Sequence, residues 1–277
     1  MAQMTTPSVR LDNGIEVPQL GFGVSHVLPE QTRELTEIAL AAGYRHFDLT
    51  TSFDDETAVG AALAASGLPR EEYFVTARLC DSELDRDSTL EAFEASLERL
   101  GLDHVDLYLL DRSTLTDGRL FDAWRAFVEV LREEAARAIG VSNFRIEDLG
   151  LLEAETKTHP AVNQVELHPW HQQADLRAWH AAHGIVTAAW SPLAQGAVLE
   201  EPTIAEIAGV HDRTSAQTIL RWHTQLGNAV TPRAVSSERL REHIESFDFN
   251  LSDEEMAAIA GLDRGREIGS RPARFAS

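Results

Sequence analysis

The stretch Asp87-Ser-Thr-Leu-Glu-Ala-Phe-Glu-Ala-Ser-Leu-Glu-Arg-Leu100, followed shortly by Val105-Asp-Leu-Tyr-Leu-Leu110, decides the fold class. In the first part, apolar side chains from Leu90 to Leu100 recur at helical spacing, and Gly101 supplies a helix stop. The second part is a short apolar run of the length of a buried strand. An amphipathic helix that alternates with a buried strand is the repeating unit of a parallel α/β fold.

The same alternation extends along the whole chain of 277 residues. A barrel of eight strand–helix units needs about 250 residues, so we expect one (β/α)₈ TIM-barrel domain over residues 1–277. The expected helices are Thr32–Ala42, Asp87–Leu100, Leu120–Ala135, Ala174–His183 and Thr214–Leu226. The expected strands are Leu20–Gly23, Tyr44–Thr50, Tyr73–Leu79, Val105–Leu110, Ala138–Val141, Ala161–Val165, Ile185–Trp190 and Ala229–Pro232.

The segment Val9–Val17 lies ahead of the first barrel strand and has a different pattern. Asp12, Asn13 and Gly14 at its centre predict a β-hairpin closed by an Asn-Gly turn. We expect this hairpin to cover the floor of the barrel.

Composition excludes several classes of function. The formal charge of −21 argues against a nucleic-acid or anionic-membrane surface, and no segment is apolar enough to span a bilayer. Cys80 is the single cysteine, and the histidines do not repeat at a metal-site spacing, so neither a disulfide nor a metal is expected. We expect a cytoplasmic protein, a monomer, whose partner is a small-molecule substrate.

Function in such a barrel comes from the carboxyl ends of the strands, where polar motifs stand out in this sequence. The motifs are Gly43-Tyr-Arg-His-Phe-Asp48, Gly140-Val-Ser-Asn-Phe144, Asn163-Gln-Val-Glu-Leu-His-Pro169, Trp190-Ser-Pro-Leu-Ala-Gln-Gly196, and Pro232-Arg-Ala234 followed by Glu238-Arg239. In this order and spacing they resemble those of the aldo-keto reductases, in particular the bacterial 2,5-diketo-gluconate reductase-like branch, from about Val9 to about Asp263.

The resemblance implies hydride transfer between NADPH and an aldehyde or ketone. It places the nicotinamide carboxamide on Ser142, Asn143 and Gln164, which together offer hydrogen-bond donors and acceptors. It makes Trp190 the aromatic platform beneath the nicotinamide, with Ser191 and Leu193 following in the cofactor-binding motif.

For the adenosine end of the cofactor, the resemblance implies that Arg233 and Arg239 bind the 2′-phosphate, and it places Glu242 in the helix that follows. Because guanidinium groups bind phosphate bidentately, NADP is favoured over NAD. Two positions depart from the family pattern: a serine is replaced by Ala234 and an adenine-contacting asparagine by His243. Each change removes at most one hydrogen bond, so binding is still expected.

The catalytic positions depart further. Of the Asp, Tyr, Lys and His that the family uses around the substrate oxygen, only the aspartate is kept, as Asp48. The other three positions hold Phe53, Arg78 and Asp111. Phe53 has no hydroxyl with which to protonate an alkoxide, and Arg78 has no phenol to acidify, so ordinary carbonyl reduction should be very weak. Activated electrophiles, such as an iminium ion or a conjugated alkene, need less help from an acid.

Two further interpretations stay open for Asp48, Arg78 and Asp111. They form an ion-pair network that replaces the lost hydrogen bonds, or they serve a redox-neutral dehydratase, isomerase or cyclase in which Asp111 is acid or base. A third possibility is a non-catalytic protein that senses NADPH or binds a partner. The sequence assigns no role to His26 and His171, and Arg112 is either a surface charge or an anion-binding group.

Overall fold

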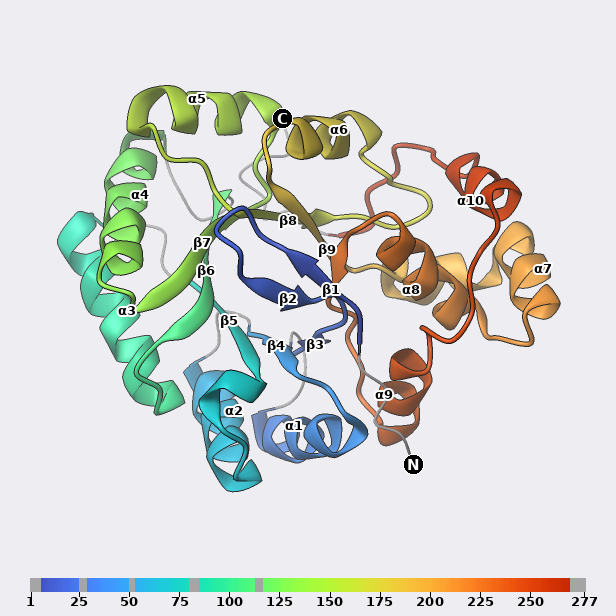
Figure 1. The fold of residues 1–277 in the computed structure, drawn as a ribbon, viewed down its shortest axis with the longest axis horizontal. Coiled ribbons are helices and arrows are strands. Elements are labelled where there is room, and N and C mark those ends of the chain that lie inside the picture. The colour runs from blue at the N-terminus through green and yellow to red at the C-terminus, as the bar shows by residue number, and fades with distance from the viewer. Residues whose placement is uncertain (1–5, 25–28, 50–52, 80–84, 113–116, 270–277) are drawn as a thin grey trace.

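The computed structural model describes residues 6–24, 29–49, 53–79, 85–112 and 117–269, without the side chains of residues 29, 53, 117 and 118. Within these residues eight parallel strands form one sheet in sequence order, from β3 to β10. The sheet closes on itself, because Leu20 bridges Val230 and Gly23 bridges Arg233 in parallel fashion. The predicted (β/α)₈ barrel is confirmed, with helices ringing the strands (Figure 1).

The barrel strands run close to their predicted positions. They are β3 (Phe22–Gly23), β4 (His46–Asp48), β5 (Phe74–Arg78), β6 (Val105–Asp111), β7 (Ala136–Ser142), β8 (Val162–Glu166), β9 (Val186–Trp190) and β10 (Ala229–Val230). The helices around them are α1 (Pro29–Ala42), α2 (Phe53–Ser66), α3 (Arg86–Leu100), α4 (Asp117–Arg132), α5 (Ile146–Thr156), α6 (Ala174–Ala182), α7 (Pro202–Val210), α8 (Ser215–Gln225), α9 (Ser237–Ile244) and α10 (Asp253–Ala260).

Local sequence sets the ends of these helices. Asp85 caps α3 by accepting a hydrogen bond from the Ser88 backbone, and Gly101 ends the helix in the left-handed conformation, with φ of 65°. Helix α4 ends at Arg132, earlier than the predicted Ala135, because Glu134 takes a left-handed φ of 60° and the chain turns into β7. Caps and turn geometry therefore set the helix ends, which lie within a few residues of the ends that the periodicity predicts.

The predicted N-terminal hairpin is present as β1 (Ser8–Arg10) and β2 (Glu16–Pro18), which pair antiparallel. Its loop differs from a two-residue Asn-Gly turn: Leu11 and Ile15 are linked by a hydrogen bond across three residues, and only Gly14 has a positive φ. The hairpin crosses the centre of the barrel in Figure 1. Its buried Val17 joins the barrel-interior cluster of Phe74 and Leu107, so the hairpin closes the amino-terminal end of the barrel.

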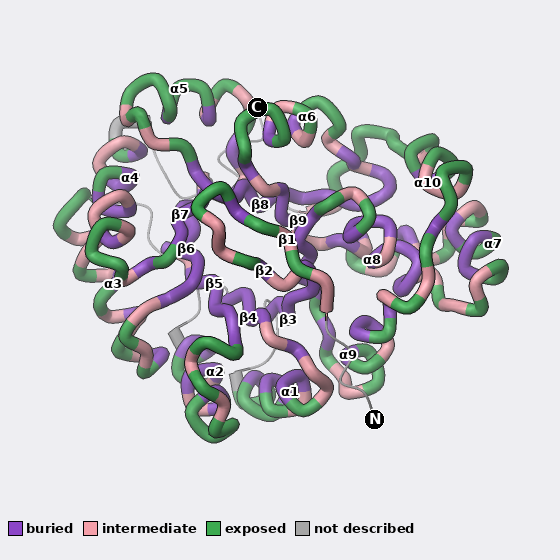
Figure 2. The backbone as a smooth tube through the Cα atoms, in the orientation of Figure 1, coloured by how far each residue is buried: buried purple, intermediate pink, exposed green. Residues whose placement is uncertain are grey.

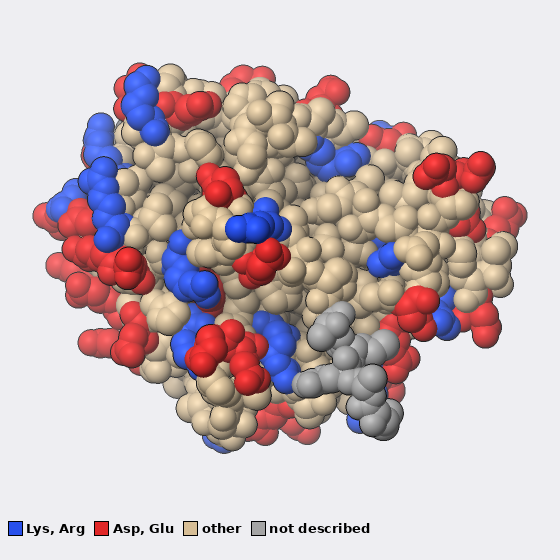
Figure 3. Space-filling model, viewed as in Figure 1, with Lys and Arg blue, Asp and Glu red and all other residues tan. Residues whose placement is uncertain are grey.

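Burial follows the layers of the fold. The barrel strands are mostly buried, whereas the hairpin strands β1 and β2 and the outward faces of the helices are largely exposed or half-buried (Figure 2). On the face that carries the hairpin, acidic side chains are spread over the rim and basic ones gather beside the hairpin and along one edge (Figure 3). No helix among the described residues is long and apolar enough to cross a membrane.

Candidate functional site

Polar side chains gather where the barrel strands end. Asp48 is the last residue of β4 and Arg78 is the last residue of β5. The next two strands, β6 and β7, end in Asp111 and Ser142. Because the strands are parallel, these side chains share one rim of the barrel, at the end opposite the hairpin.

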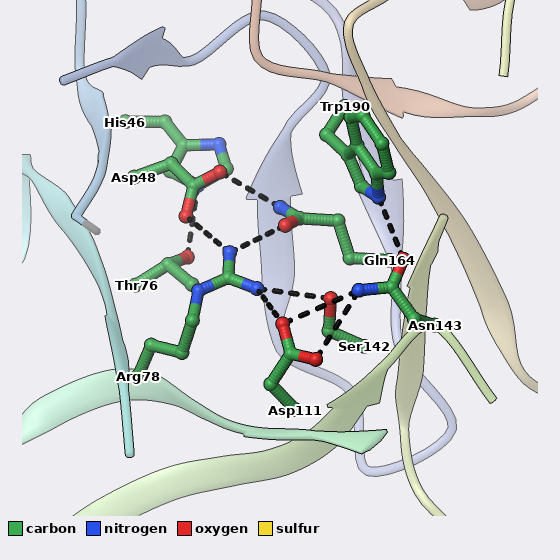
Figure 4. Close-up of polar contacts among 9 residues, drawn as sticks. All are labelled: His46, Asp48, Thr76, Arg78, Asp111, Ser142, Asn143, Gln164 and Trp190. Atoms are coloured by element: carbon green, nitrogen blue, oxygen red, sulfur yellow. Dashed lines mark hydrogen bonds and ion pairs between the residues drawn. The ribbon is translucent and has the colours of Figure 1, made fainter. Parts of the chain in front are cut away.

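Arg78 lies at the centre of this rim (Figure 4). Its Nη2 is 3.6 Å from Asp48 Oδ1 and its Nη1 is 3.5 Å from Asp111 Oδ2. Nη1 also donates to Ser142 Oγ over 2.9 Å, and Nη2 donates to Gln164 Oε1. One guanidinium therefore links the expected ion-pair network to two of the residues predicted to bind a carboxamide.

The amide of Gln164, on β8, spans Arg78 and Asp48. Because a guanidinium only donates, the Gln164 oxygen faces Arg78 and its nitrogen faces Asp48. Gln164 Nε2 donates to Asp48 Oδ2 over 2.7 Å. The orientation of this amide is thus set by its neighbours.

The amide of Asn143 is fixed in the same way from the other side. Trp190, at the end of β9, donates from its indole nitrogen to Asn143 Oδ1 over 2.9 Å. Asn143 Nδ2 is then left to donate to both oxygens of Asp111, at 3.2 and 3.3 Å. Asn143 can hold this position because it adopts a left-handed φ of 63°, which asparagine tolerates better than most residues.

The charge at the rim is negative on balance. Asp48 accepts from Gln164, Asp111 accepts from Asn143, and each carboxylate has an oxygen within 3.6 Å of the Arg78 guanidinium. Asp48 is 6% and Asp111 9% exposed, and Arg78 supplies the opposing charge between them. Two carboxylates against one guanidinium leave a formal charge of −1.

A cleft with a volume of about 1020 Å³ runs from this network along the barrel rim. It continues past Trp190 and the loop after β9 to Arg239, at the start of α9. Every residue predicted for the site whose side chain the structure describes lines this cleft. These are Asp48, Arg78, Asp111, Ser142, Asn143, Gln164, Trp190, Ser191, Leu193, Arg233, Arg239 and Glu242.

The far end of the cleft is basic. In the described part of the chain the guanidinium groups of Arg233 and Arg239 have no ion-pair partner, so both are available to an anion. His243 lies beside them and is 2% exposed, and burial lowers its pKa to about 4. Its Nδ1 has no hydrogen-bond partner among the described residues, so a neutral imidazole borders the cleft there.

A contact that sequence reasoning missed closes the cleft near Trp190. Gly269, in the segment after α10, lies against the indole so closely that a Cβ would overlap the ring. Glu166, at the end of β8, holds this segment by accepting from the backbone nitrogens of Ile268 at 2.6 Å and Gly269 at 2.9 Å. Burial raises the pKa of Glu166, but these bonds and one from His168 outweigh it and the net shift is downward.

A signal for this contact existed in the sequence, since Glu166 and His168 stand in one of the strand-end motifs. Their partner segment is far away in sequence and has no motif of its own. Other cleft-lining residues that sequence reasoning did not single out are Gly23, Leu199, Thr214, Ser215, Ala216 and Thr231.

Of the remaining sequence candidates, two have side chains outside the described part of the structure and two have described partners. Phe53 is the first residue of α2, but its side chain lies outside the described part of the structure, as does His26. Arg112 is not a lone surface charge: its Nε donates to Asp148 Oδ1 over 3.0 Å. His171 Nε2 lies 3.8 Å from Glu267. Within the described residues no cluster of His, Cys, Asp and Glu could hold a metal ion.

The chain is similar to known proteins in both sequence and fold. The family model described as "Aldo/keto reductase family" matches residues 19–264. An aldo-keto reductase of Mycolicibacterium smegmatis is 44% identical over 270 residues, which is 98% of each chain. The crystal structure of an aldo/keto reductase from Brucella melitensis has a TM-score of 0.90 at 42% identity, covering 94% of this chain and 100% of that one. A Bombyx mori aldo-keto reductase in complex with NADP has a TM-score of 0.88 at 28% identity, covering 96% and 95%.

Proposed function

Because the chain belongs to the aldo/keto reductase family, we propose that it is an oxidoreductase that binds NADP(H) in this cleft and reduces ordinary carbonyl compounds only weakly. One observation carries the proposal: a single cleft joins the available guanidinium groups of Arg233 and Arg239 to the Asp48–Arg78–Asp111 network. A dinucleotide needs an anion site at one end and an amide site at the other, and the cleft offers both.

The residues at each end fit such a cofactor. Arg233 and Arg239 would hold the 2′-phosphate, and His243, whose buried Nδ1 has no hydrogen-bond partner among the described residues, lines the neighbouring part of the cleft. Ser142 keeps its hydroxyl hydrogen for donation after accepting from Arg78, and the amide of Gln164 keeps one N–H. A carboxamide can therefore bind without breaking the network. When bound, the reduced cofactor supplies a hydride.

The weakness of carbonyl reduction follows from the missing acid. Hydride addition to a ketone leaves an alkoxide, which needs a proton in the same step or soon after. The position of the family's phenol is Phe53, and a guanidinium group, as in Arg78, is too weak an acid to replace it. In the described part of the cleft neither tyrosine nor lysine replaces that acid.

Nucleotide titration tests the cofactor half of the proposal. We expect NADPH to quench tryptophan fluorescence with micromolar affinity and NADH to bind at least tenfold more weakly. Arg239→Ala should weaken NADPH by about tenfold, because it removes a charged hydrogen bond to phosphate worth roughly 1.5–3 kcal/mol. Arg241→Ala, on the same helix but away from the cleft lining, is the matched control and should bind as wild type. If neither NADPH nor NADH bound with micromolar affinity, the proposal would be contradicted.

A further inference from the structure

We infer that the electrophile this site serves is a cation, an iminium ion whose C=N⁺ carbon accepts the hydride. The inference rests on the proposed function, because it takes reduced nicotinamide as the hydride source. It goes further by naming a substrate class from the formal charge of the Asp48–Arg78–Asp111 network and from the unpartnered Oδ1 of Asp48.

The electrostatic argument starts at Asp48. Its side chain is 7% exposed, its Oδ2 accepts from Gln164, and its Oδ1 has no hydrogen-bond partner within the described structure. Arg78 lies 3.6 Å from that oxygen, which is an ion pair but not a hydrogen bond. A buried carboxylate oxygen without a donor is costly, so this atom is suited to a ligand that brings an N–H or a positive charge.

The surrounding charges favour the same kind of ligand. Counted over the described residues of this network, Asp48, Asp111 and Arg78 carry a formal charge of −1. The carboxylate of Glu166, at the end of β8, is occupied by His168 and by the segment around Gly269. The unpaired guanidinium groups belong to the opposite end of the cleft, where α9 begins. A neutral ketone gains little from this field, whereas a cation is stabilised by it.

The chemistry of reduction leads to the same class. An iminium ion and a hydride give a neutral amine: a C–H bond forms, the C=N π pair moves to nitrogen, and the nicotinamide becomes oxidised without any further proton. A ketone requires a hydride and a proton, and so does a conjugated alkene, whose first product is an enolate. Of these electrophiles only the iminium ion is independent of the acid that Phe53 cannot supply.

A matched pair of substrates tests the inference with the intact protein. The protonated cyclic imine 2-methyl-1-pyrroline and the ketone cyclopentanone have rings of the same size. With NADPH present, we expect the imine to be reduced at least 100-fold faster than the ketone. Equal rates, or faster reduction of the ketone, would overturn the inference.

A binding measurement provides a readout that does not depend on turnover. Pyrrolidinium, a cation of the same ring size, should bind the nucleotide-free protein in calorimetry at least tenfold more tightly than neutral cyclopentanol. Asp48→Asn and Asp111→Asn should each weaken pyrrolidinium binding about tenfold. Asp122→Asn, which removes one negative charge on α4 away from the cleft lining, should leave it unchanged.

The two proposals fail in different ways. If NADPH does not bind, the proposed function is wrong. If NADPH binds while pyrrolidinium binds no better than cyclopentanol, or is indifferent to both aspartate variants, only the iminium inference is wrong. Thermal melts of the two variants confirm that they fold, and because the substitutions lie on different strands, either folded variant decides the question.

Discussion

The indole nitrogen of Trp190 donates a hydrogen bond to Asn143 Oδ1 over 2.9 Å, and this contact sets the orientation of the Asn143 amide toward Asp111. Because an indole can only donate, the Asn143 oxygen is committed to it and the amide nitrogen must face Asp111. Asp111 thereby accepts from Asn143 and also lies 3.5 Å from Arg78 Nη1.

The first prediction concerns the redox state of the bound cofactor. The oxidised nicotinamide ring carries a positive charge that the reduced ring lacks, so the net negative charge of the network should favour NADP⁺. We expect Asp111→Asn to reduce the preference for NADP⁺ over NADPH by about tenfold, or ~1.4 kcal/mol. Equilibrium titration of both nucleotides measures this ratio. A ratio that is the same in wild type and variant would show that the network does not act on the nicotinamide.

The second prediction restores the missing acid. The triple change Phe53→Tyr, Arg78→Lys and Asp111→His should raise NADPH-dependent reduction of a simple aldehyde at least tenfold above wild type, since general acid catalysis is commonly worth about 10²–10⁴-fold. The double change Arg78→Lys and Asp111→His is the matched control. It should stay at the wild-type level because it contains no phenol. If the double variant matched the triple, the role assigned to position 53 would be wrong.

The third prediction uses the pH dependence of stability. His180 is fully buried, accepts from Asn163 Nδ2 at 3.0 Å and donates to Thr187 Oγ1 at 2.9 Å, so its ring is neutral. Burial lowers its pKa from 6.5 to about 4. Between pH 4 and 6.5 the unfolded chain binds a proton at His180 that the folded protein does not bind. The stability gained from the neutral ring is therefore complete above pH 6.5 and is lost as the pH falls, by up to about 1.4 kcal/mol per pH unit.

Urea unfolding between pH 7.5 and 5 measures the effect. His180→Gln, whose amide can also accept and donate, should flatten the pH dependence of the free energy of unfolding. His183→Gln changes an exposed ring at the end of the same helix; because burial lowers the pKa of His180 more than His183 does, this variant should keep most of the wild-type slope. A slope unaffected by His180→Gln would show that the neutral ring is not required for stability.

The fourth prediction concerns helix packing. Gly60, in α2, lies against the backbone of Leu100 at the end of α3, and a Cβ there would overlap the Leu100 carbonyl. Gly60→Ala should therefore lower the free energy of unfolding by about 1–3 kcal/mol. Gly150, in the middle of α5, has open space around its Cβ position, so Gly150→Ala should stabilise by about 0.5–1 kcal/mol. Equal effects of the two changes in chemical denaturation would argue against this packing.

Much of the barrel could be predicted because its information is local. The helix from Asp87 to Leu100 is marked by its own periodicity and by Gly101, and the structure places α3 within one residue of that prediction. Strand β3 is shorter than predicted because Leu20 joins the sheet only through a single bridge to Val230. This bridge closes the barrel between segments that are far apart in the sequence. Such long-range pairing leaves no mark in a single segment.

The residues of the candidate site could be predicted from the sequence, but the hydrogen bonds and ion pairs among them could not. Strand-end motifs gave its residues, and the parallel sheet brings them to one rim. The sequence did not indicate that Arg78 would bond to Ser142 and Gln164 as well as to the two carboxylates, since these contacts depend on rotamers set across four strands. Nor did it indicate that Glu166 would hold the segment at Gly269 over Trp190.

The central claim is that the cofactor cleft is kept while the proton donor is lost, and turnover of a simple aldehyde by protein saturated with NADPH tests it most directly. Saturation is established first by fluorescence titration on the same sample. The account predicts micromolar NADPH binding together with a turnover number at least about 100-fold below the roughly 10 s⁻¹ typical of enzymes. Turnover near 10 s⁻¹ would contradict it, because the network of Asp48, Arg78 and Asp111 would then suffice for ordinary carbonyl reduction.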